Sequence, residues 1–289
     1  MQRPPVTRIP SNPSLEGLAE MIPDVIYSSA TGQDLTLTLL APWRNRACEA
    51  APPKRPLIVF VQGSGFTRPW IYPEIPQLAR YAQHGYVVAA VTHRSCLEGH
   101  PFPAYLQDVK TAIRFLRRHA EEYGIDANRV GIWGTSSGGN AALLAGLTQG
   151  DPAYGTEEHA GYSDEVKCVV DCFGPADMTV LYESAKAARN ERLLDLLYGL
   201  MGGKENPAIL KAMSPLHRIE KGRKYPPFLL LQGEADELVP FGQTLQMYET
   251  LLDAGCRAEM IVVESGPHGG AFWSPDVHRR ILDFFNRHL

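Results

Sequence analysis

A β-strand, a sharp turn and an α-helix are predicted in succession by residues 130–144, VGIWGTSSGGNAALL. The apolar run at the start is typical of a buried strand, and the small and apolar residues at the end are typical of a buried helix. Between them lies Gly-x-Ser-x-Gly, with Ser136 at its centre. In this context the motif predicts a nucleophilic serine on a strained turn, where Gly134 and Gly138 leave room for neighbouring chain. A glycine-rich turn without chemistry is the alternative, so the remaining sequence has to supply partners for the serine.

The composition limits what kind of protein this is. The chain has 289 residues, of which 44% are hydrophobic, and this is enough for a sizeable core and argues against disorder. Its net charge is -4, and its longest basic run, Arg117-Arg118-His119, lies on a predicted helix face. We therefore expect no nucleic-acid partner. No apolar stretch has the ~18 residues of a membrane span and the N-terminus has no signal-peptide core, so we expect a cytoplasmic protein without a membrane partner.

The cysteines do not suggest a disulfide framework or a metal site. Their number is five, which is odd, and they are scattered along the chain, at Cys48, Cys96, Cys168, Cys172 and Cys256. Cys168 and Cys172 lie on one face of a predicted strand, so we interpret them as core thiols. No zinc-ligand spacing occurs, and we expect neither a metal nor a cofactor.

The order of apolar runs predicts an α/β fold. After an N-terminal antiparallel hairpin, residues 24–28 and 35–40 around a turn, the runs become continuous and alternate with helical patterns. They are residues 57–61, 86–91, 130–133, 168–170, 228–231 and 260–263. Strands buried on both faces have this composition, so a mostly parallel central sheet with helices on both faces is predicted.

One domain, residues 1–289, accounts for the whole chain. The clearest helix runs from about Val109 to Tyr123 and stops at Gly124, and a final helix is expected over residues 276–288. Residues 174–225 break the rhythm, because they are helical and of mixed polarity but contain no strand. We interpret them as a small helical lid beside the site, with an ordinary crossover helix and long loops as the alternative.

A nucleophilic serine needs a histidine base and a carboxylate that orients it. On a parallel sheet these should follow later strands in the order serine, acid, histidine. The loop after residues 228–231 contains three carboxylates, of which Asp236 lies deepest and is the preferred acid, with Glu234 as the runner-up.

The loop after residues 260–263 supplies the base. It contains Ser265-Gly266-Pro267-His268-Gly269-Gly270, whose glycines allow an imidazole to reach across the sheet. The other histidines lie on predicted helices or precede the acid loop; they are His84, His93, His100, His119, His159, His217, His278 and His288. His268 is therefore the predicted general base.

Acyl transfer also needs donors for the oxyanion. The first buried strand ends in Gln62-Gly63-Ser64-Gly65-Phe66, where small residues leave backbone amides uncovered. With the amide of Ser137, at the start of a helix, the amides of Ser64 and Gly65 are the predicted donors. A tight turn without this role is the alternative for the loop.

Several segments together resemble the α/β-hydrolase superfamily from about residue 24 to the end. They are FPAYLQDVKTAIRFL (102–116), YGID (123–126), GTSSGGN (134–140), FGPAD (173–177), MSP (213–215) and PFLLLQGEAD (227–236). The chain looks most like the hormone-sensitive-lipase-like enzymes and, closer, the bifunctional acetylxylan/feruloyl esterases. The resemblance implies Ser136, Asp236 and His268 as the triad and Ser64, Gly65 and Ser137 as oxyanion donors. The chain departs from the group at Gln62, where the group usually has histidine.

The resemblance implies a serine carboxylesterase for short acyl or hydroxycinnamoyl esters, which include small molecules and plant polysaccharide fragments. Aromatic residues near predicted loops are candidates for the substrate pocket, with core or loop packing as the alternative for at least half of them; they are Phe66, Trp70, Tyr72, Phe173, Tyr182 and Trp273. A prolyl-oligopeptidase-type peptidase, a non-catalytic binding protein on the same fold and an acyltransferase are the competing functions. A homo-oligomer is compatible with the sequence.

Overall fold

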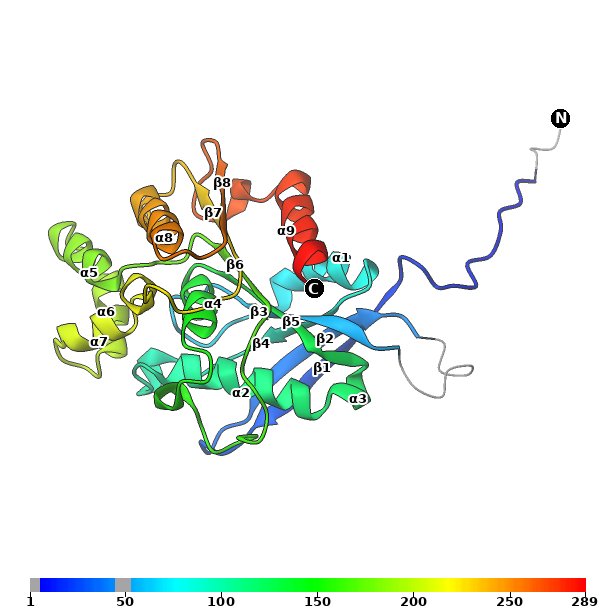
Figure 1. Cartoon of the computed structure of the whole chain (residues 1–289), viewed down its shortest axis with the longest axis horizontal. Helices are drawn as coiled ribbons and strands as arrows, with labels where there is room; N and C mark the ends of the chain where they lie inside the picture. The colour runs from blue at the N-terminus through cyan, green and yellow to red at the C-terminus, as the bar shows by residue number, and fades with distance from the viewer. Residues whose placement is uncertain (1–5, 45–52) are drawn as a thin grey trace.

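A computed structural model describes residues 6–44 and 53–289, which form an α/β domain around one eight-stranded sheet (Figure 1). Across the sheet the strand order is β1-β2-β4-β3-β5-β6-β7-β8. The strands are β1 (Ala19–Ser28), β2 (Leu35–Pro42), β3 (Arg55–Val61), β4 (Val87–Val91), β5 (Ile125–Thr135), β6 (Cys168–Cys172), β7 (Phe228–Gly233) and β8 (Ala258–Val263).

The predicted fold class is confirmed. Strands β1 and β2 form the antiparallel hairpin, and β2 also pairs antiparallel with β4. All other neighbouring strands are parallel. The carboxyl ends of β3, β5, β6, β7 and β8 therefore meet at one edge of the sheet, which is where loops carrying a site converge in such folds.

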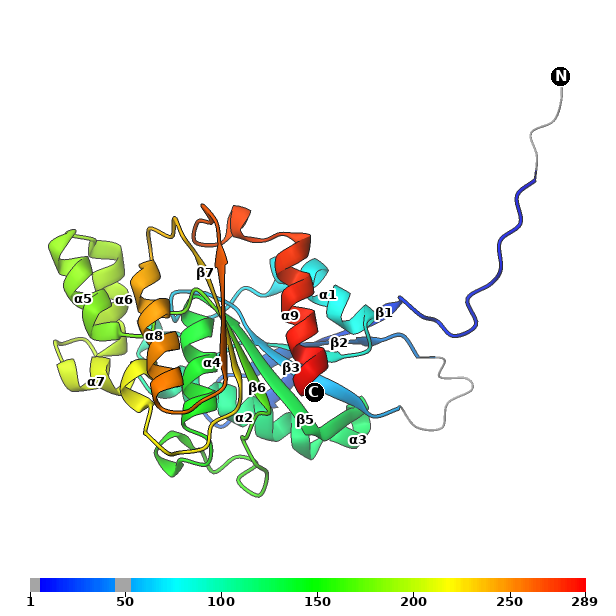
Figure 2. The ribbon, with the colours of Figure 1, turned by 45° about the horizontal axis from the view of Figure 1, so that its top comes forward.

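Helices cover both faces of the sheet, with α1 and α9 on one face and α2, α4 and α8 on the other (Figure 2). The helices are α1 (Ile75–Gln83), α2 (Ala104–Arg118), α3 (Ala120–Tyr123), α4 (Ser137–Leu147), α5 (Met178–Ala187), α6 (Glu191–Leu200), α7 (Pro207–Ala212), α8 (Phe241–Asp253) and α9 (Pro275–His288). Strand β3 shows why both faces need cover. Leu57, Val59 and Val61 point to the α2/α4 side, whereas Ile58 and Phe60 point to the α1/α9 side, and all five are buried.

The segment between β6 and β7 contains three α-helices, α5, α6 and α7, and a short 3-10 helix, Pro215–Arg218. It has no strand among its residues 174–225, all of which the structure describes. The three helices lie together at one end of the domain (Figure 1). Leu197 and Leu200 of α6 are buried in the same core cluster as α2 and α4, so the segment packs onto the domain.

Two elements differ from the sequence-based boundaries. The single helix expected over residues 109–123 is divided at His119 into α2 and α3, although it stops as predicted at Gly124, where φ is +67°. Strand β5 begins at Ile125, five residues before the predicted start at Val130, because Ile125 pairs with Arg55 of β3. Pairing between distant segments extends the strand beyond its own apolar run.

Cys168 and Cys172 are fully buried free thiols of the core, as predicted. Cys96 and Cys256 are also free, and Cys48 lies outside the described residues.

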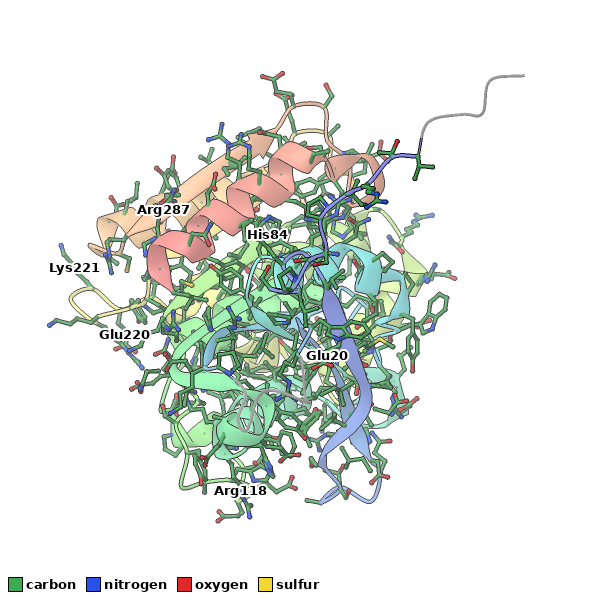
Figure 3. All side chains as sticks on the ribbon, turned by 90° about the vertical axis from the view of Figure 1, so that its right-hand side faces the viewer. Glu20, His84, Arg118, Glu220, Lys221 and Arg287 are labelled. Atoms are coloured by element: carbon green, nitrogen blue, oxygen red, sulfur yellow. The ribbon has the colours of Figure 1, made fainter. Side chains whose placement is uncertain are left out.

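Charged side chains of both signs are spread over the surface, and Figure 3 shows Arg118, Glu220 and Lys221 projecting at the edge of the molecule. Many of them form exposed pairs, such as Arg287 with Glu259 at 2.7 Å. Within residues 6–44 and 53–289, no helix has both the length and the apolar character needed to cross a membrane.

Candidate active site

Ser136 occupies the turn between β5 and α4 in a strained conformation, with φ 52° and ψ -123°. The amide of Ser136 donates to the carbonyl of Cys172 at 2.9 Å, which ties the turn to β6. A Cβ on Gly134 would lie 1.9 Å from the carbonyl oxygen of Gly138, and one on Gly138 would lie 2.0 Å from that of Val61. Only glycine fits at these two positions, so the motif spacing is explained by close contact of main chains.

The three predicted triad residues converge at the carboxyl edge of the sheet. Nε2 of His268 lies 2.9 Å from Oγ of Ser136, and Nδ1 of His268 lies 2.7 Å from Oδ2 of Asp236. These residues come from the loops after β5, β7 and β8. Both distances are within hydrogen-bond range, and this is the geometry by which an imidazole takes a proton from a hydroxyl while a carboxylate orients the ring.

Asp236 is held as a carboxylate. Burial raises its pKa, but the hydrogen bonds from His268 and from the Val239 and Leu238 amides outweigh this, and the pKa ends below its usual value. Its Oδ1 accepts both amides at 2.8 Å, and its Oδ2 also accepts Nε2 of Gln232 at 2.9 Å. A fully bonded carboxylate of this kind fixes the tautomer of the ring it contacts.

The runner-up acid, Glu234, bonds to the main chain of the loop that carries His268. Its side chain accepts the amide of Ser265 at 3.1 Å and is exposed. It therefore braces the loop that carries His268, and Asp236 makes the contact with the imidazole.

Phe173, a predicted pocket residue, instead supports the imidazole. Its ring centroid lies 4.6 Å from that of His268, and Phe173 itself is buried. Trp273 packs behind it, with ring centroids 6.0 Å apart, and stacks on His278. Neither residue lines the cavity beside Ser136; Phe173 packs against the rings of His268 and Trp273, and Trp273 packs against Phe173 and His278.

The loop Gln62-Gly63-Ser64-Gly65 lies against the nucleophile, since a Cβ on Gly63 would stand 2.6 Å from Cβ of Ser136. The amide of Ser64, expected as an oxyanion donor, instead donates to Oγ of Ser137 at 2.9 Å. Gly65 follows with φ +62°, and the amide of Ser137 belongs to the first turn of α4, where N–H groups have no partner within the helix. The Gly65 and Ser137 amides are therefore the candidate donors, and Ser64 is corrected to a bracing residue.

Gln62, the departure from the family pattern, has its side chain bonded outside this loop. Its Nε2 donates to Glu74 at 3.3 Å, and its Oε1 is buried without a hydrogen-bond partner in the described structure. Burial raises the pKa of Glu74, and the Gln62 hydrogen bond partly opposes this.

A cavity of about 610 Å³ opens beside Ser136 and extends under the α5–α6 segment. Leucines dominate its wall away from the serine, and Phe66 is the one predicted aromatic residue that lines it. The lining residues are Ser64, Gly65, Phe66, Thr67, Leu97, Ser136, Ser137, Pro175, Leu181, Asn190, Arg192, Leu193, Asp195, Leu196, Leu197, Leu238 and Val239. Trp70 is outside this wall and 70% exposed, and Tyr72 and Tyr182 are also outside it.

Sequence reasoning missed several residues that shape the site. Leu193, Leu196 and Leu197 of α6 have the spacing of one helix face, and this pattern was readable in the sequence. Thr135 accepts the amide of Gly63 from a segment 72 residues away, and a local pattern has no signal for such a hydrogen bond. Gln232 donates to Asp236, which lies four residues later in the chain.

No group of three or more His, Cys, Asp or Glu side chains that could hold a metal ion occurs in the part of the chain that the structure describes.

Comparison with known proteins finds esterases among the similar sequences and structures. The family model BD-FAE matches residues 48–251. The esterase LipC of Mycobacterium tuberculosis is 30% identical over 74% of this chain and 52% of its own length. The chain thus spans about half the length of the curated relatives it matches.

Solved esterase structures align over nearly the whole chain. A truncated carbohydrate esterase from gut microbiota has a TM-score of 0.75 and 28% identity, over 93% of this chain and 96% of its own. A propionate-bound esterase of Thermogutta terrifontis has a TM-score of 0.72 and 26% identity, over 94% of both chains. On the family match and these likenesses, the chain belongs to the BD-FAE family of α/β-hydrolase esterases.

Proposed function

We propose that the chain is a serine carboxylesterase that hydrolyses esters of short acyl or hydroxycinnamoyl groups, with Ser136 forming the acyl-enzyme. The observation that carries the proposal is the unbroken hydrogen-bonded series from Ser136 Oγ through His268 to Asp236, at 2.9 and 2.7 Å. A hydroxyl so paired, next to a cavity and at a helix N-terminus, has the base, the space and the dipole that attack on an ester carbonyl requires.

The reaction follows from this geometry. Ser136 Oγ attacks the carbonyl carbon while His268 Nε2 takes the hydroxyl proton, and Asp236 stabilises the imidazolium without taking the proton itself. The carbonyl oxygen, now negative, accepts hydrogen bonds from the amides of Gly65 and Ser137. His268 then donates its proton to the leaving alcohol, and a water molecule activated in the same way releases the acid.

The cavity supports an apolar acyl group. Its volume of about 610 Å³ is within the range of small-ligand pockets and exceeds what an acetyl group fills. Its leucine-rich wall matches an aliphatic chain or the ring of a hydroxycinnamoyl group. A neighbouring structure holds propionate and another holds butyrate, which favours short acids for this chain as well.

The alcohol side is proposed from relatives alone. One neighbour is titled a carbohydrate esterase and another a bifunctional GH43-CE. A sugar hydroxyl group of a polysaccharide fragment is therefore the candidate leaving group.

The test is a screen of acetyl, butyryl, octanoyl and feruloyl esters with the parent chain and Ser136→Ala. We expect kcat/KM of the parent to be highest for butyryl or feruloyl esters, and Ser136→Ala to lose about 10⁵-fold or more in kcat. Asp236→Asn should lose about 10⁴-fold because the imidazole then adopts the wrong tautomer, whereas Glu234→Gln, its matched control, should keep most of the activity. Equal rates for the parent and Ser136→Ala, or hydrolysis of amides in preference to esters, would contradict the proposal.

A further inference from the structure

The two residues that flank the nucleophile hold the oxyanion loop with their hydroxyl groups. The amide of Gly63 donates to Oγ1 of Thr135 at 2.8 Å, and the amide of Ser64 donates to Oγ of Ser137 at 2.9 Å. Both hydroxyl-bearing residues are buried, with exposed fractions of 6% and 3%. Two consecutive loop amides are thus bonded to side chains on either side of Ser136.

The far side of the same loop is closed by a second pair of bonds. Oγ of Ser64 donates to the carbonyl of Thr67 at 2.5 Å, and Oγ1 of Thr67 donates to the carbonyl of Ser64 at 2.6 Å. Gly65 lies between them, with φ +62°. Its amide is therefore positioned by contacts on both sides of it in the sequence.

Gln62 does not take part in this bracing, because its amide is directed to Glu74. Glycines at 63 and 65 make the loop intrinsically free to move, so its position depends on the hydrogen bonds that remain. Displacement of an oxyanion donor by about 1 Å is enough to cost up to about 100-fold in rate.

We propose that Thr135 and Ser137 are positioning residues, whose hydroxyls clamp the Gly63 and Ser64 amides and so place the Gly65 amide at the carbonyl oxygen of the ester. The inference rests on the proposed esterase function. Ser137 acts twice in it: its hydroxyl holds the loop, and its own amide is the second donor. Nucleophile and oxyanion hole are thereby set by one tripeptide, Thr135-Ser136-Ser137.

The test removes each hydroxyl and keeps the main chain. Thr135→Val and Ser137→Ala should each lower kcat by about 10-fold with KM changed less than about 2-fold, because the loss falls on the transition state. The affinity of a transition-state analogue, a trifluoromethyl ketone, should fall in parallel with kcat. Thr135→Ser restores the hydroxyl and should recover the parental kcat.

Hydrogen exchange gives a readout independent of activity. Peptides that contain Gly63 and Ser64 should exchange faster in Thr135→Val and Ser137→Ala than in the parent, since their amides lose their acceptors. Thr92→Val is the matched control, because the Thr92 hydroxyl also accepts a backbone amide, that of Thr36 at 3.2 Å, on the far side of β4. It should leave kcat and exchange at residues 63–64 unchanged.

Unchanged kcat in both folded variants, or a rise in KM alone, would overturn the clamp. So would a loss of kcat in Thr135→Ser as large as that in Thr135→Val, since the hydroxyl is then not what matters. If the parent hydrolyses no ester at all, the proposed function fails; if it does and the hydroxyl variants match it, only this inference fails.

Discussion

Gly139, Gly174 and the buried carboxyl group of Asp171 determine how closely the main chain packs just after Ser136. Asp171 of β6 is 1% exposed, and its Oδ1 accepts the amide of Gly174 at 3.0 Å. A Cβ on Gly139 would stand 2.2 Å from that oxygen, and one on Gly174 would stand 2.4 Å from it. The first turn of α4, directly after the nucleophile, therefore packs against the Asp171 carboxyl group, and a side chain at position 139 would clash with it.

Asp171 predicts a pH dependence of stability. Burial raises the pKa of Asp171 to about 7, against the Gly174 hydrogen bond, while its unfolded value is about 3.9. Between these values the folded state binds more protons than the unfolded state, so the free energy of unfolding falls as pH rises through about 4 to 7. The parent should lose a few kcal/mol relative to Asp171→Asn over this window, in urea unfolding at pH 4.5 and 7.5. A difference between the two proteins that does not vary with pH would contradict this.

At the scale of elements, α6 determines what faces the serine. Its residues Leu193, Leu196 and Leu197 line the cavity, and Cδ1 of Leu196 lies 3.1 Å from the position of a Cβ on Gly65. The helix thus contacts the oxyanion loop directly, although Leu196 follows Gly65 by 131 positions in the sequence. The N-terminus of α6 is capped by Asn190, whose side chain accepts the amide of Leu193 at 3.1 Å.

Leu196→Ala should shift acyl-length preference. Removing this side chain enlarges the cavity next to the carbonyl site, so kcat/KM for octanoyl esters should rise relative to butyryl esters by about 10-fold. Leu194→Ala is the matched control, because Leu194 lies on the same helix outside the cavity wall, and its ratio should not change. If Leu196→Ala leaves the ratio of kcat/KM for octanoyl and butyryl esters unchanged, Leu196 does not contact the acyl group.

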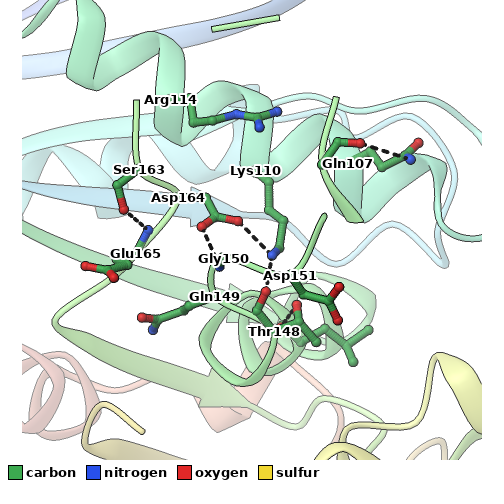
Figure 4. Close-up of polar contacts among 12 residues, drawn as sticks. Gln107, Lys110, Arg114, Thr148, Gln149, Gly150, Asp151, Ser163, Asp164 and Glu165 are labelled. Carbon is green, nitrogen blue, oxygen red and sulfur yellow. Dashed lines mark hydrogen bonds and ion pairs between the residues drawn. The ribbon is translucent and has the colours of Figure 1, made fainter. Parts of the chain in front are cut away.

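At the scale of the whole molecule, buried polar contacts attach the loop after α4 to α2. Nζ of Lys110, which is fully buried, contacts Oδ2 of Asp164 at 2.7 Å and also the carbonyl of Thr148 (Figure 4). Oδ1 of Asp164 accepts the amide of Gly150 at 2.9 Å. Burial lowers the pKa of Lys110, and Asp164 partly opposes this.

Asp164→Asn should therefore destabilise the fold and leave the chemistry intact. It leaves the buried Lys110 ammonium without its carboxylate, and breaking a buried pair from one side costs about 3 to 5 kcal/mol. The loss should appear in the free energy of unfolding, with kcat per folded molecule unchanged. Glu259→Gln, which breaks the exposed pair with Arg287, should have no measurable effect, and an equal effect of both changes would show that burial is not the cause.

Much of this architecture was readable in advance, because it rests on local patterns. Continuous apolar runs predicted the parallel strands, and the triad followed from chemistry and chain order, since serine, acid and histidine must follow successive strands to meet at one edge. The sequence did not predict correctly which aromatic residues line the cavity, apart from Phe66. Trp70, Phe173 and Trp273 are aromatic and near loops, but that does not say whether a ring faces a cavity, solvent or another ring.

The amino-acid sequence was enough to predict the fold class and Ser136 as the serine on the turn between strand and helix. It was also enough to predict Asp236 as the acid and His268 as the base, because motif spacing and strand order constrain all three. Tertiary structure alone decided which amides of the oxyanion loop are bonded to side chains. Gly63 and Thr135 are 72 residues apart in the sequence, and Ser64 and Ser137 are 73 residues apart. A hydrogen bond over that separation depends on how two strands are placed side by side, and neither strand's own sequence records it.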